Sequence, residues 1–347
     1  MYEIWANGIA EECGGKHLEI VVKTIEEDDD QERYFSEISK LINDIKKILS
    51  ERNIGSNEAL KIQKCWIVDR NTEIKSRPTK SILLLEDVKH LGFKDVAEEF
   101  PDGLDYEHSV LTISNLARFH AASYVFRKTA RIDWTEEYPL ISSNIDVPRL
   151  PKEMVSILED IFKESSDFSK YSWLFMGPPS EKMDMINRKV DTFGVLSHGN
   201  CIKQNLVFQY RKAVDLKRIC SDVIFKDPCS YKFSSCVVDL LQFIFTSMEP
   251  MVRQSFMADF VCSVYYDNFV KTVSSIDSSI PVFSKKSFIK EFDQNIIYGF
   301  LFSLHHLSGN NEGSPRSLKK QMMESMRDLI QFKINTKATL YTGPRVK

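Results

Sequence analysis

The spacing of apolar residues changes near residue 88, and this change constrains the fold more than any other feature of the chain. Before it, short apolar runs separated by turn residues predict strands. After it, apolar residues recur every three or four positions, as in helices. We therefore expect an α+β protein of two lobes. Residues 1–88 would form a small antiparallel sheet with one helix, and residues 89–347 a mainly helical lobe.

The first lobe is predicted from four apolar runs, which cover residues 2–12, 18–25, 60–68 and 81–85. The first two flank Gly14 and Gly15, which tolerate the positive φ angles of a tight hairpin. An acidic stretch at residues 26–30 precedes a helix with apolar residues at helical spacing, namely Phe35, Ile38, Leu41, Ile42, Ile45 and Leu49. In the second lobe, helices are predicted from Tyr106 onward, over residues 237–245, and at the end of the chain after Pro315 and Arg316.

Composition excludes several classes of protein. The net charge of -3 argues against nonspecific nucleic-acid binding as the main task. The sequence contains no run of eighteen apolar residues and no secretory leader, so we expect a cytoplasmic protein without a membrane span. The seven cysteines are scattered and lack zinc spacing, which favours reduced thiols in the core over a metal site or disulfides. No sequence feature fixes the oligomeric state.

The segment from His198 to Asn205 has the spacing of a phosphotransferase catalytic loop. In such a loop, an Asp two residues after the His accepts the proton of an attacking hydroxyl, and an Asn five residues later ligates magnesium. Here Asn205 is at the magnesium position, but Asn200 occupies the position of the Asp. An amide can donate or accept a hydrogen bond but cannot take that proton.

Further signals precede this loop in the order expected for a nucleotide site. Lys23 lies in a predicted strand and Glu37 in the following helix, an arrangement that fixes the α- and β-phosphates in kinase-type folds. Glu86 and Asp87 end an apolar strand and would form the connector that meets an adenine edge. Taken alone, these residues are also consistent with a solvent-facing lysine, a helix-surface acid and a polar turn.

A second magnesium ligand is predicted at Asp227, which lies at the end of the strand segment over residues 223–226 soon after the loop. Magnesium takes one or two protein oxygens together with phosphate oxygens and water. Alone, Asp227 followed by Pro228 would indicate only a turn.

The combination resembles the ecdysteroid kinase-like family, also called the choline-kinase-like or CHK family, within the aminoglycoside and choline phosphotransferase group. The resemblance covers nearly the whole chain. It is carried by residues 116–123 (LARFHAAS), residues 85–88 (LEDV) followed by Gly92 and Phe93, the loop 198–205, and the interval from Asp227 to Asp239.

This resemblance implies a protein-kinase-like fold, the cofactors ATP and magnesium, and a small hydroxylated lipophilic substrate such as a steroid. It implies that His198 and Asn200 lie at the catalytic centre. Asp239 would anchor the catalytic loop through backbone hydrogen bonds, and His120 would be a packed helix residue.

Three features depart from the family pattern. Asn200 replaces the catalytic Asp, the Phe and Gln expected after Asp227 are Pro228 and Cys229, and only about twenty residues precede Lys23. A first strand and a glycine-bearing phosphate loop therefore have no room, so nucleotide binding is expected to be weak or the chain is a fragment.

Three hypotheses follow from these features. The chain is an ATP-dependent small-molecule kinase impaired by Asn200, a pseudokinase that acts through partners, or an unrelated α+β binding protein. The order and spacing of the signals together disfavour the third.

Overall fold

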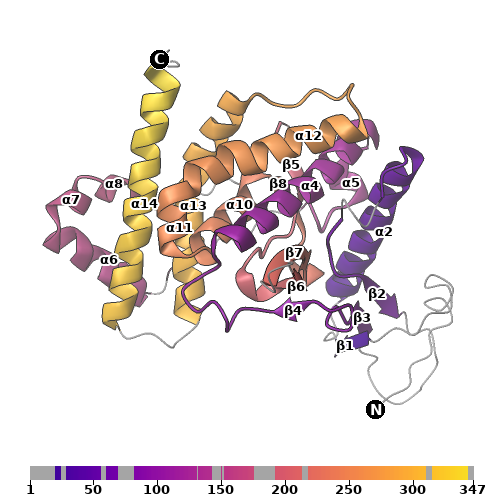
Figure 1. Ribbon diagram of the computed structural model, residues 1–347, viewed down its shortest axis with the longest axis horizontal. Coiled ribbons are helices and arrows are strands. Elements are labelled where there is room, and N and C mark those ends of the chain that lie inside the picture. The colour runs from indigo at the N-terminus through magenta and orange to yellow at the C-terminus, as the bar shows by residue number, and fades with distance from the viewer. Residues whose placement is uncertain are drawn as a thin grey trace.

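The computed structural model describes residues 20–24, 29–55, 60–68, 82–130, 132–142, 150, 152–175, 192–212, 218–309 and 315–342. A small sheet lies toward one side of the molecule, and helices α6 (Lys152–Glu164), α7 (Ser166–Ser169) and α8 (Ser172–Phe175) lie at the other side, beyond α14 (Pro315–Thr342) (Figure 1). The predicted Gly14–Gly15 hairpin lies outside the described residues except for part of its second strand.

The sheet consists of β1 (Ile20–Thr24), β3 (Ile82–Glu86) and β2 (Cys65–Val68), in the antiparallel order β1-β3-β2. The last strand in sequence therefore lies in the middle, where Leu83 pairs with Lys23 and Leu85 with Cys65. The run predicted over residues 60–68 is a strand only from Cys65 onward. Its first half instead pairs outside this sheet, because Ile62 forms a bridge with Phe225.

Helix α2 (Asp29–Glu51) follows β1 and confirms the predicted apolar pattern. The buried side chains of the helix are the predicted ones: Phe35, Ile38, Leu41, Ile42, Ile45 and Leu49. They belong to one hydrophobic cluster that also contains the helices of the second lobe. The helix therefore packs against both parts of the molecule. Since one hydrophobic cluster spans them, the lobe boundary at residue 88 stays a prediction.

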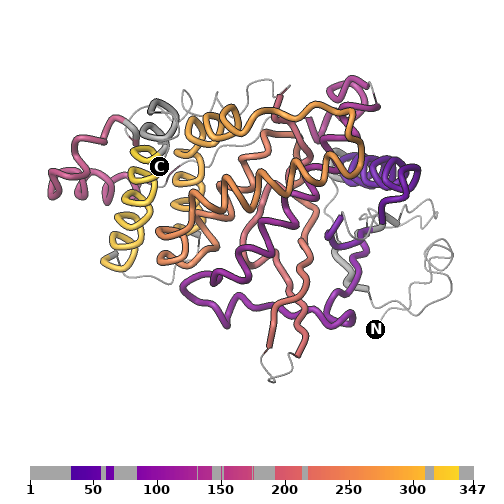
Figure 2. Tube along the Cα trace, turned by 45° about the horizontal axis from the view of Figure 1, so that its top comes forward, coloured from indigo at the N-terminus to yellow at the C-terminus, as the bar shows by residue number. Residues whose placement is uncertain are grey.

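The helical part is built around α4 (Tyr106–Ala130), whose side chains are buried on nearly every face. The other helices are α5 (Trp134–Glu137), α6 (Lys152–Glu164), α7 (Ser166–Ser169), α8 (Ser172–Phe175), α10 (Val237–Thr246), α11 (Pro250–Asp259), α12 (Tyr266–Ile276), α13 (Lys285–Gly309) and α14. A π-helical turn, η3 (Phe260–Tyr265), joins α11 to α12. Figure 2 shows α4 and α12 running side by side through the centre, and these two helices pack together.

Two further small sheets present the candidate site. One contains β4 (Lys94–Asp95), β6 (Leu206–Lys212) and β7 (Arg218–Phe225), and the other β5 (Gly194–Ser197) and β8 (Lys232–Ser235). The loop from His198 to Asn205, ending in the 3-10 turn η1 (Lys203–Asn205), connects β5 to β6. Asp227 follows β7 directly. The predicted α+β class is confirmed, and in the described residues every helix is too short or too polar to cross a bilayer.

Candidate active site

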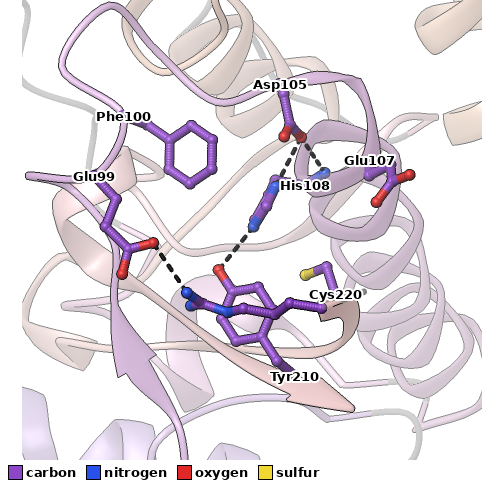
Figure 3. Close-up of a pocket in the computed structure, with 8 residues that line it drawn as sticks. Glu99, Phe100, Asp105, Glu107, His108, Tyr210 and Cys220 are labelled. Atoms are coloured by element: carbon purple, nitrogen blue, oxygen red, sulfur yellow. Dashed lines mark hydrogen bonds and ion pairs between the residues drawn. The ribbon is translucent and has the colours of Figure 1, made fainter. Parts of the chain in front are cut away.

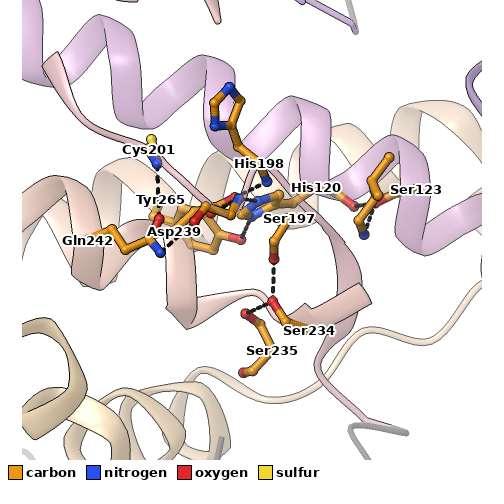
Figure 4. A network of polar contacts seen from close by, with 12 residues as sticks. His120, Ser123, Ser197, His198, Cys201, Ser234, Ser235, Asp239, Gln242 and Tyr265 are labelled. Atoms are coloured by element: carbon orange, nitrogen blue, oxygen red, sulfur yellow. Dashed lines mark hydrogen bonds and ion pairs between the residues drawn. The ribbon is translucent and has the colours of Figure 1, made fainter. Parts of the chain in front are cut away.

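The loop after β5 is held by a carboxylate from the first turn of α10. Asp239 is fully buried, its Oδ2 accepts a hydrogen bond from the backbone N–H of His198 at 2.6 Å, and its Oδ1 accepts one from that of Gly199 at 2.8 Å (Figure 4). This confirms the predicted anchoring role. Burial raises the pKa of Asp239, but hydrogen bonds from His120 and Gly199 outweigh it and hold that pKa below its usual value.

His120 supports this anchor from α4. It is fully buried, and its Nε2 lies 2.9 Å from Oδ2 of Asp239 while its Nδ1 lies 2.7 Å from the hydroxyl of Tyr265. The carboxylate can only accept, so Nε2 carries a proton and donates to Asp239. His120 is thus the packed helix residue that the sequence predicted.

Gln242 lies one helical turn after Asp239 and holds the rest of the loop. Its Oε1 accepts from the N–H of Cys201 at 2.9 Å, and its Nε2 donates to the carbonyl of Gly199 at 2.9 Å. The sequence analysis did not predict a role for Gln242. Its spacing of three residues from Asp239 puts both side chains on one helix face, and this spacing could have indicated that Gln242 also faces the loop.

His198 is completely buried and points away from solvent. Its Nε2 lies 2.6 Å from the carbonyl oxygen of Lys226, so Nε2 carries a proton and donates to that oxygen. Nδ1 has no hydrogen-bond partner among the described residues. Burial lowers the pKa of His198 below 6.5 and favours the neutral ring. His198 therefore ties the loop to the residue before Asp227.

Gly199 is required by the backbone at this point. Its φ is +78°, and a Cβ there would lie 1.8 Å from the carbonyl oxygen of Ser230. Any side chain would separate the loop from the turn after Asp227. The glycine therefore allows the close approach of two segments that both carry predicted site residues.

Asn200 and Asn205 are linked within the loop. The Nδ2 of Asn205 donates to the backbone carbonyl of Asn200 at 3.0 Å. Since a carbonyl only accepts, this bond fixes the orientation of the amide and leaves its Oδ1 on the other side. Both residues are partly exposed. The side chain of Asn200 makes no hydrogen bond within the described residues, so the loop backbone holds its shape without it.

Asp227 lies beside Asn205, because the N–H of Lys226 donates to the carbonyl of Asn205 at 2.8 Å. Asp227 has φ +62°, a left-handed conformation that few residues other than glycine adopt. The structure thus brings together the backbones that carry Asn200, Asn205 and Asp227.

The predicted connector residues lie next to the small sheet. Glu86 is buried, and its carboxylate pairs with Lys64 at 3.3 Å. Its backbone N–H and carbonyl are both bonded, to Lys64 and Gln63. Asp87 accepts from the N–H of Lys89 at 2.9 Å and closes a turn. Contact of this connector with an adenine edge stays a prediction.

The predicted pair of Lys23 and Glu37 stays a prediction. Lys23 lies in β1, and its side chain is outside the described residues. Glu37 is half-buried on α2, and its Oε2 accepts from the backbone N–H groups of Leu140 at 3.0 Å and Ile141 at 3.2 Å. No pattern in the sequence indicates these partners in the helical part.

A cavity of about 880 Å³ opens beside the loop and is lined in part by Lys203 and Gln204. Its wall combines apolar, acidic and basic side chains. The apolar part includes Phe245, Met248, Met251 and Leu307, the carboxylates are Glu98, Asp102, Glu249 and Glu324, and the basic side chains are Lys203, Arg253, His306 and Lys320. The Oε1 of Gln204 is buried and has no hydrogen-bond partner among the described residues. The cavity can hold a drug-sized molecule that brings hydrogen-bond donors.

A second, smaller cavity of about 300 Å³ lies on the surface near β6 and β7 (Figure 3). Its polar groups bond one another. His108 lies between Asp105 at 2.7 Å and the Tyr210 hydroxyl at 2.8 Å, and Arg218 pairs with Glu99 at 3.3 Å. This network caps the first turn of α4, and its polar side chains already serve as one another's hydrogen-bond partners.

Comparison with known proteins decides the family. The sequence profile of the ecdysteroid kinase-like family matches residues 16–278. The chain belongs to the ecdysteroid kinase-like family. A search of curated proteins gives no match.

Similar solved structures are aminoglycoside phosphotransferases. One is from Alicyclobacillus acidocaldarius, with 12% identity, a TM-score of 0.45, and coverage of 94% of this chain and 88% of that one. Another is the GDP complex of aminoglycoside 2'-phosphotransferase-IIIa, with 11% identity, a TM-score of 0.38, and coverage of 94% and 96%. The predicted family is confirmed by the profile match.

Proposed function

We propose that this member of the family is an ATP-dependent phosphotransferase that acts on a hydroxyl of a small lipophilic molecule, with turnover limited by Asn200. The observation that carries the proposal is the loop from His198 to Asn205. Its backbone is anchored by Asp239 and Gln242 and borders a cavity of suitable size.

Asn205 and Asp227 fit the requirements of a magnesium ion bound with a nucleotide. The amide of Asn205 is oriented by its bond to Asn200, so its oxygen is the atom left to ligate. Within the described residues, no group of three or more His, Cys, Asp or Glu could hold a metal alone. The ion would therefore share its coordination between these two residues, phosphate oxygens and water. When bound, Mg-ATP supplies the phosphoryl group and neutralises its charge.

The acceptor would lie in the 880 Å³ cavity. A flat apolar body can pack against Phe245, Met248 and Leu307, while hydroxyl groups donate to carboxylates such as Glu98 and Glu249. Cavities of roughly 300 to 1,000 Å³ bind drug-sized ligands, and a hydroxylated steroid falls within that class. This lining supports the predicted hydroxylated lipophile.

Asn200 determines how fast such a reaction proceeds. Its Oδ1 can accept the hydrogen bond of an acceptor hydroxyl and orient it, but it does not take the proton. A general base contributes about 10² to 10⁴-fold to the rate. The remaining catalysis comes from positioning and from the metal, which dominate phosphoryl transfer.

The test is Asn200→Asp, assayed for phosphate transfer from labelled ATP to a panel of hydroxylated steroids and smaller alcohols. We expect product formation to rise by about 10² to 10⁴-fold. Asn200→Ala is the control, since it removes the amide without adding a base. A wild-type rate equal to that of Asn200→Asp would contradict the assignment of residue 200 as the limiting position.

A second candidate function is that of a pseudokinase, and Asn200 is the observation that favours it. Under this proposal the protein binds nucleotide weakly or not at all and acts through a partner. Asn200→Asp would then stay inert even where calorimetry detects Mg-ATP binding. That combination of results would decide for the pseudokinase.

A further inference from the structure

Gln63 lies between the connector and the turn that carries Asp227. It is 7% exposed, although glutamine is usually a surface residue. Its Nε2 donates to the carbonyl of Glu86 at 2.8 Å, and its Oε1 accepts from the N–H of Asp227 at 3.3 Å. One side chain therefore bonds both the nucleotide connector and the predicted metal ligand.

Backbone hydrogen bonds fix the position of the Cα atom of Gln63. The N–H of Gln63 donates to the carbonyl of Phe225 at 2.8 Å, and the N–H of Phe225 donates to the carbonyl of Lys61 at 2.8 Å. On the other side, the N–H of Glu86 donates to the carbonyl of Lys64. The side chain thus starts from a backbone position held on both sides and has little freedom to rotate away.

Only a group with one donor and one acceptor can make both contacts. The Glu86 carbonyl needs a donor, and the Asp227 N–H needs an acceptor. The amide of Gln63 supplies both, so the amide orientation follows from its partners. A hydrocarbon of the same length would leave both backbone groups buried without a bond.

Asp227 has particular need of such a contact. Its φ of +62° is a left-handed conformation, which costs a residue with a side chain about 1 to 2 kcal/mol unless its surroundings hold it. The bond from Gln63 acts directly on the N–H of this strained residue. A shift of the Asp227 backbone would move its carboxylate relative to Asn205.

We propose that Gln63 is a positioning residue for the metal site. From the connector, it holds the backbone of Asp227 so that the carboxylate of Asp227 and the amide oxygen of Asn205 serve the same magnesium ion. The inference rests on the proposed nucleotide site. It assigns a role to a residue that is neither in the loop nor in the turn itself.

The experiment is calorimetry of ATP binding with and without magnesium, on wild type and on Gln63→Met. Methionine has a similar length and no strong hydrogen-bonding group. Loss of the bond to Asp227 should weaken the magnesium-dependent part of ATP affinity by about 3- to 10-fold, in line with one hydrogen bond. Affinity for ATP without magnesium should stay within about twofold of wild type.

Two further variants separate positioning from general loss of structure. Gln209→Leu is the matched control, because the side chain of Gln209 also donates to a backbone carbonyl, that of Leu91 at 3.1 Å, and within the described residues it makes no hydrogen bond to Asp227. It should bind like wild type. Gln63→Asn is the second variant. It keeps the amide but is one methylene shorter, so it cannot span from the carbonyl of Glu86 to the N–H of Asp227, and its magnesium-dependent affinity should fall as in Gln63→Met.

The outcomes are distinct. If wild type binds no ATP with magnesium, the proposed function fails, and the role of Gln63 fails with it. If wild type binds and Gln63→Met keeps the full magnesium dependence, the proposed function stands and only the role of Gln63 is refuted. Should Gln63→Met not fold, Gln63→Asn decides, since full magnesium dependence in that variant would overturn the inference.

Discussion

The anchor of the candidate catalytic loop can be tested by replacing Asp239 with asparagine. The substitution keeps the shape of the side chain and replaces one acceptor oxygen by an NH2 group. The two oxygens of Asp239 accept from His198, Gly199 and His120 at 2.6 to 2.9 Å. In the less costly orientation, the new NH2 group faces the N–H of Gly199, which then has no acceptor.

The magnitude follows from these three bonds. A buried donor left without an acceptor costs about 1 to 3 kcal/mol, and bonds to a neutral acceptor are weaker than bonds to a charged one. Because asparagine is neutral, the variant no longer bears the desolvation cost of a buried carboxylate, and this offsets part of the lost stability. We expect Asp239→Asn to lower the free energy of unfolding by about 2 to 4 kcal/mol.

Urea unfolding at pH 7 measures this difference from the midpoint and slope of the transition. The control is Asp222→Asn, because Asp222 is partly exposed and pairs with Lys61 near the surface at 2.8 Å, so its loss should cost at most about 1 kcal/mol. The pKa of Asp239 is lowered in the folded protein, so its contribution is present above the ordinary value of 3.8 and is lost as the pH falls below it. An Asp239→Asn protein within 1 kcal/mol of wild type at pH 7 would refute the anchoring argument.

Three other outcomes are expected. Gly199→Ala should fail to fold or lose more than about 3 kcal/mol of unfolding free energy, because its Cβ would lie 1.8 Å from a carbonyl oxygen. The control is Gly92→Ala, which is also at positive φ but whose Cβ would lie 3.6 Å from its nearest neighbour. It should lose only about 1 kcal/mol by urea unfolding. The pKa of His198 is lowered below 6.5, so the unfolded chain binds a proton that the folded one does not; wild-type stability should rise with pH between about 5 and 6.5 more steeply than that of His198→Gln. Arg253→Met leaves the buried carboxylate of Asp328 without its 2.7 Å partner and should cost about 3 to 5 kcal/mol in the same assay, much of it recovered in the double variant with Asp328→Leu.

The sequence predicted those parts of the fold that depend on local patterns. The apolar residues of α2 recur at helical spacing, and all six of those predicted are buried. The loop spacing from His198 to Asn205, with Asp227 soon after, located segments that the structure brings together through Lys226. Such predictions succeed because periodicity and short spacing are properties of a single segment.

Contacts between distant segments escaped the sequence analysis. Glu37 bonds backbone groups more than a hundred residues away, at Leu140 and Ile141. Gln63 meets the N–H of Asp227 across 164 positions. Ile62, assigned to a continuous strand, instead pairs with Phe225. In each case the partner is a backbone group. Nearly every residue carries the same backbone groups, so a sequence pattern cannot indicate which one is the partner.

The bonding of the loop explains why residue 200 can vary without disturbing its surroundings. The backbone on either side of it is held by Asp239 and Gln242, and its own carbonyl accepts from Asn205. None of these bonds uses the side chain at position 200. The side chain at position 200 therefore affects catalysis without affecting how the loop is held, because the same anchored backbone carries either Asp or Asn. The difference between an efficient phosphotransferase and an impaired one can then lie in a single proton acceptor, while the fold stays the same.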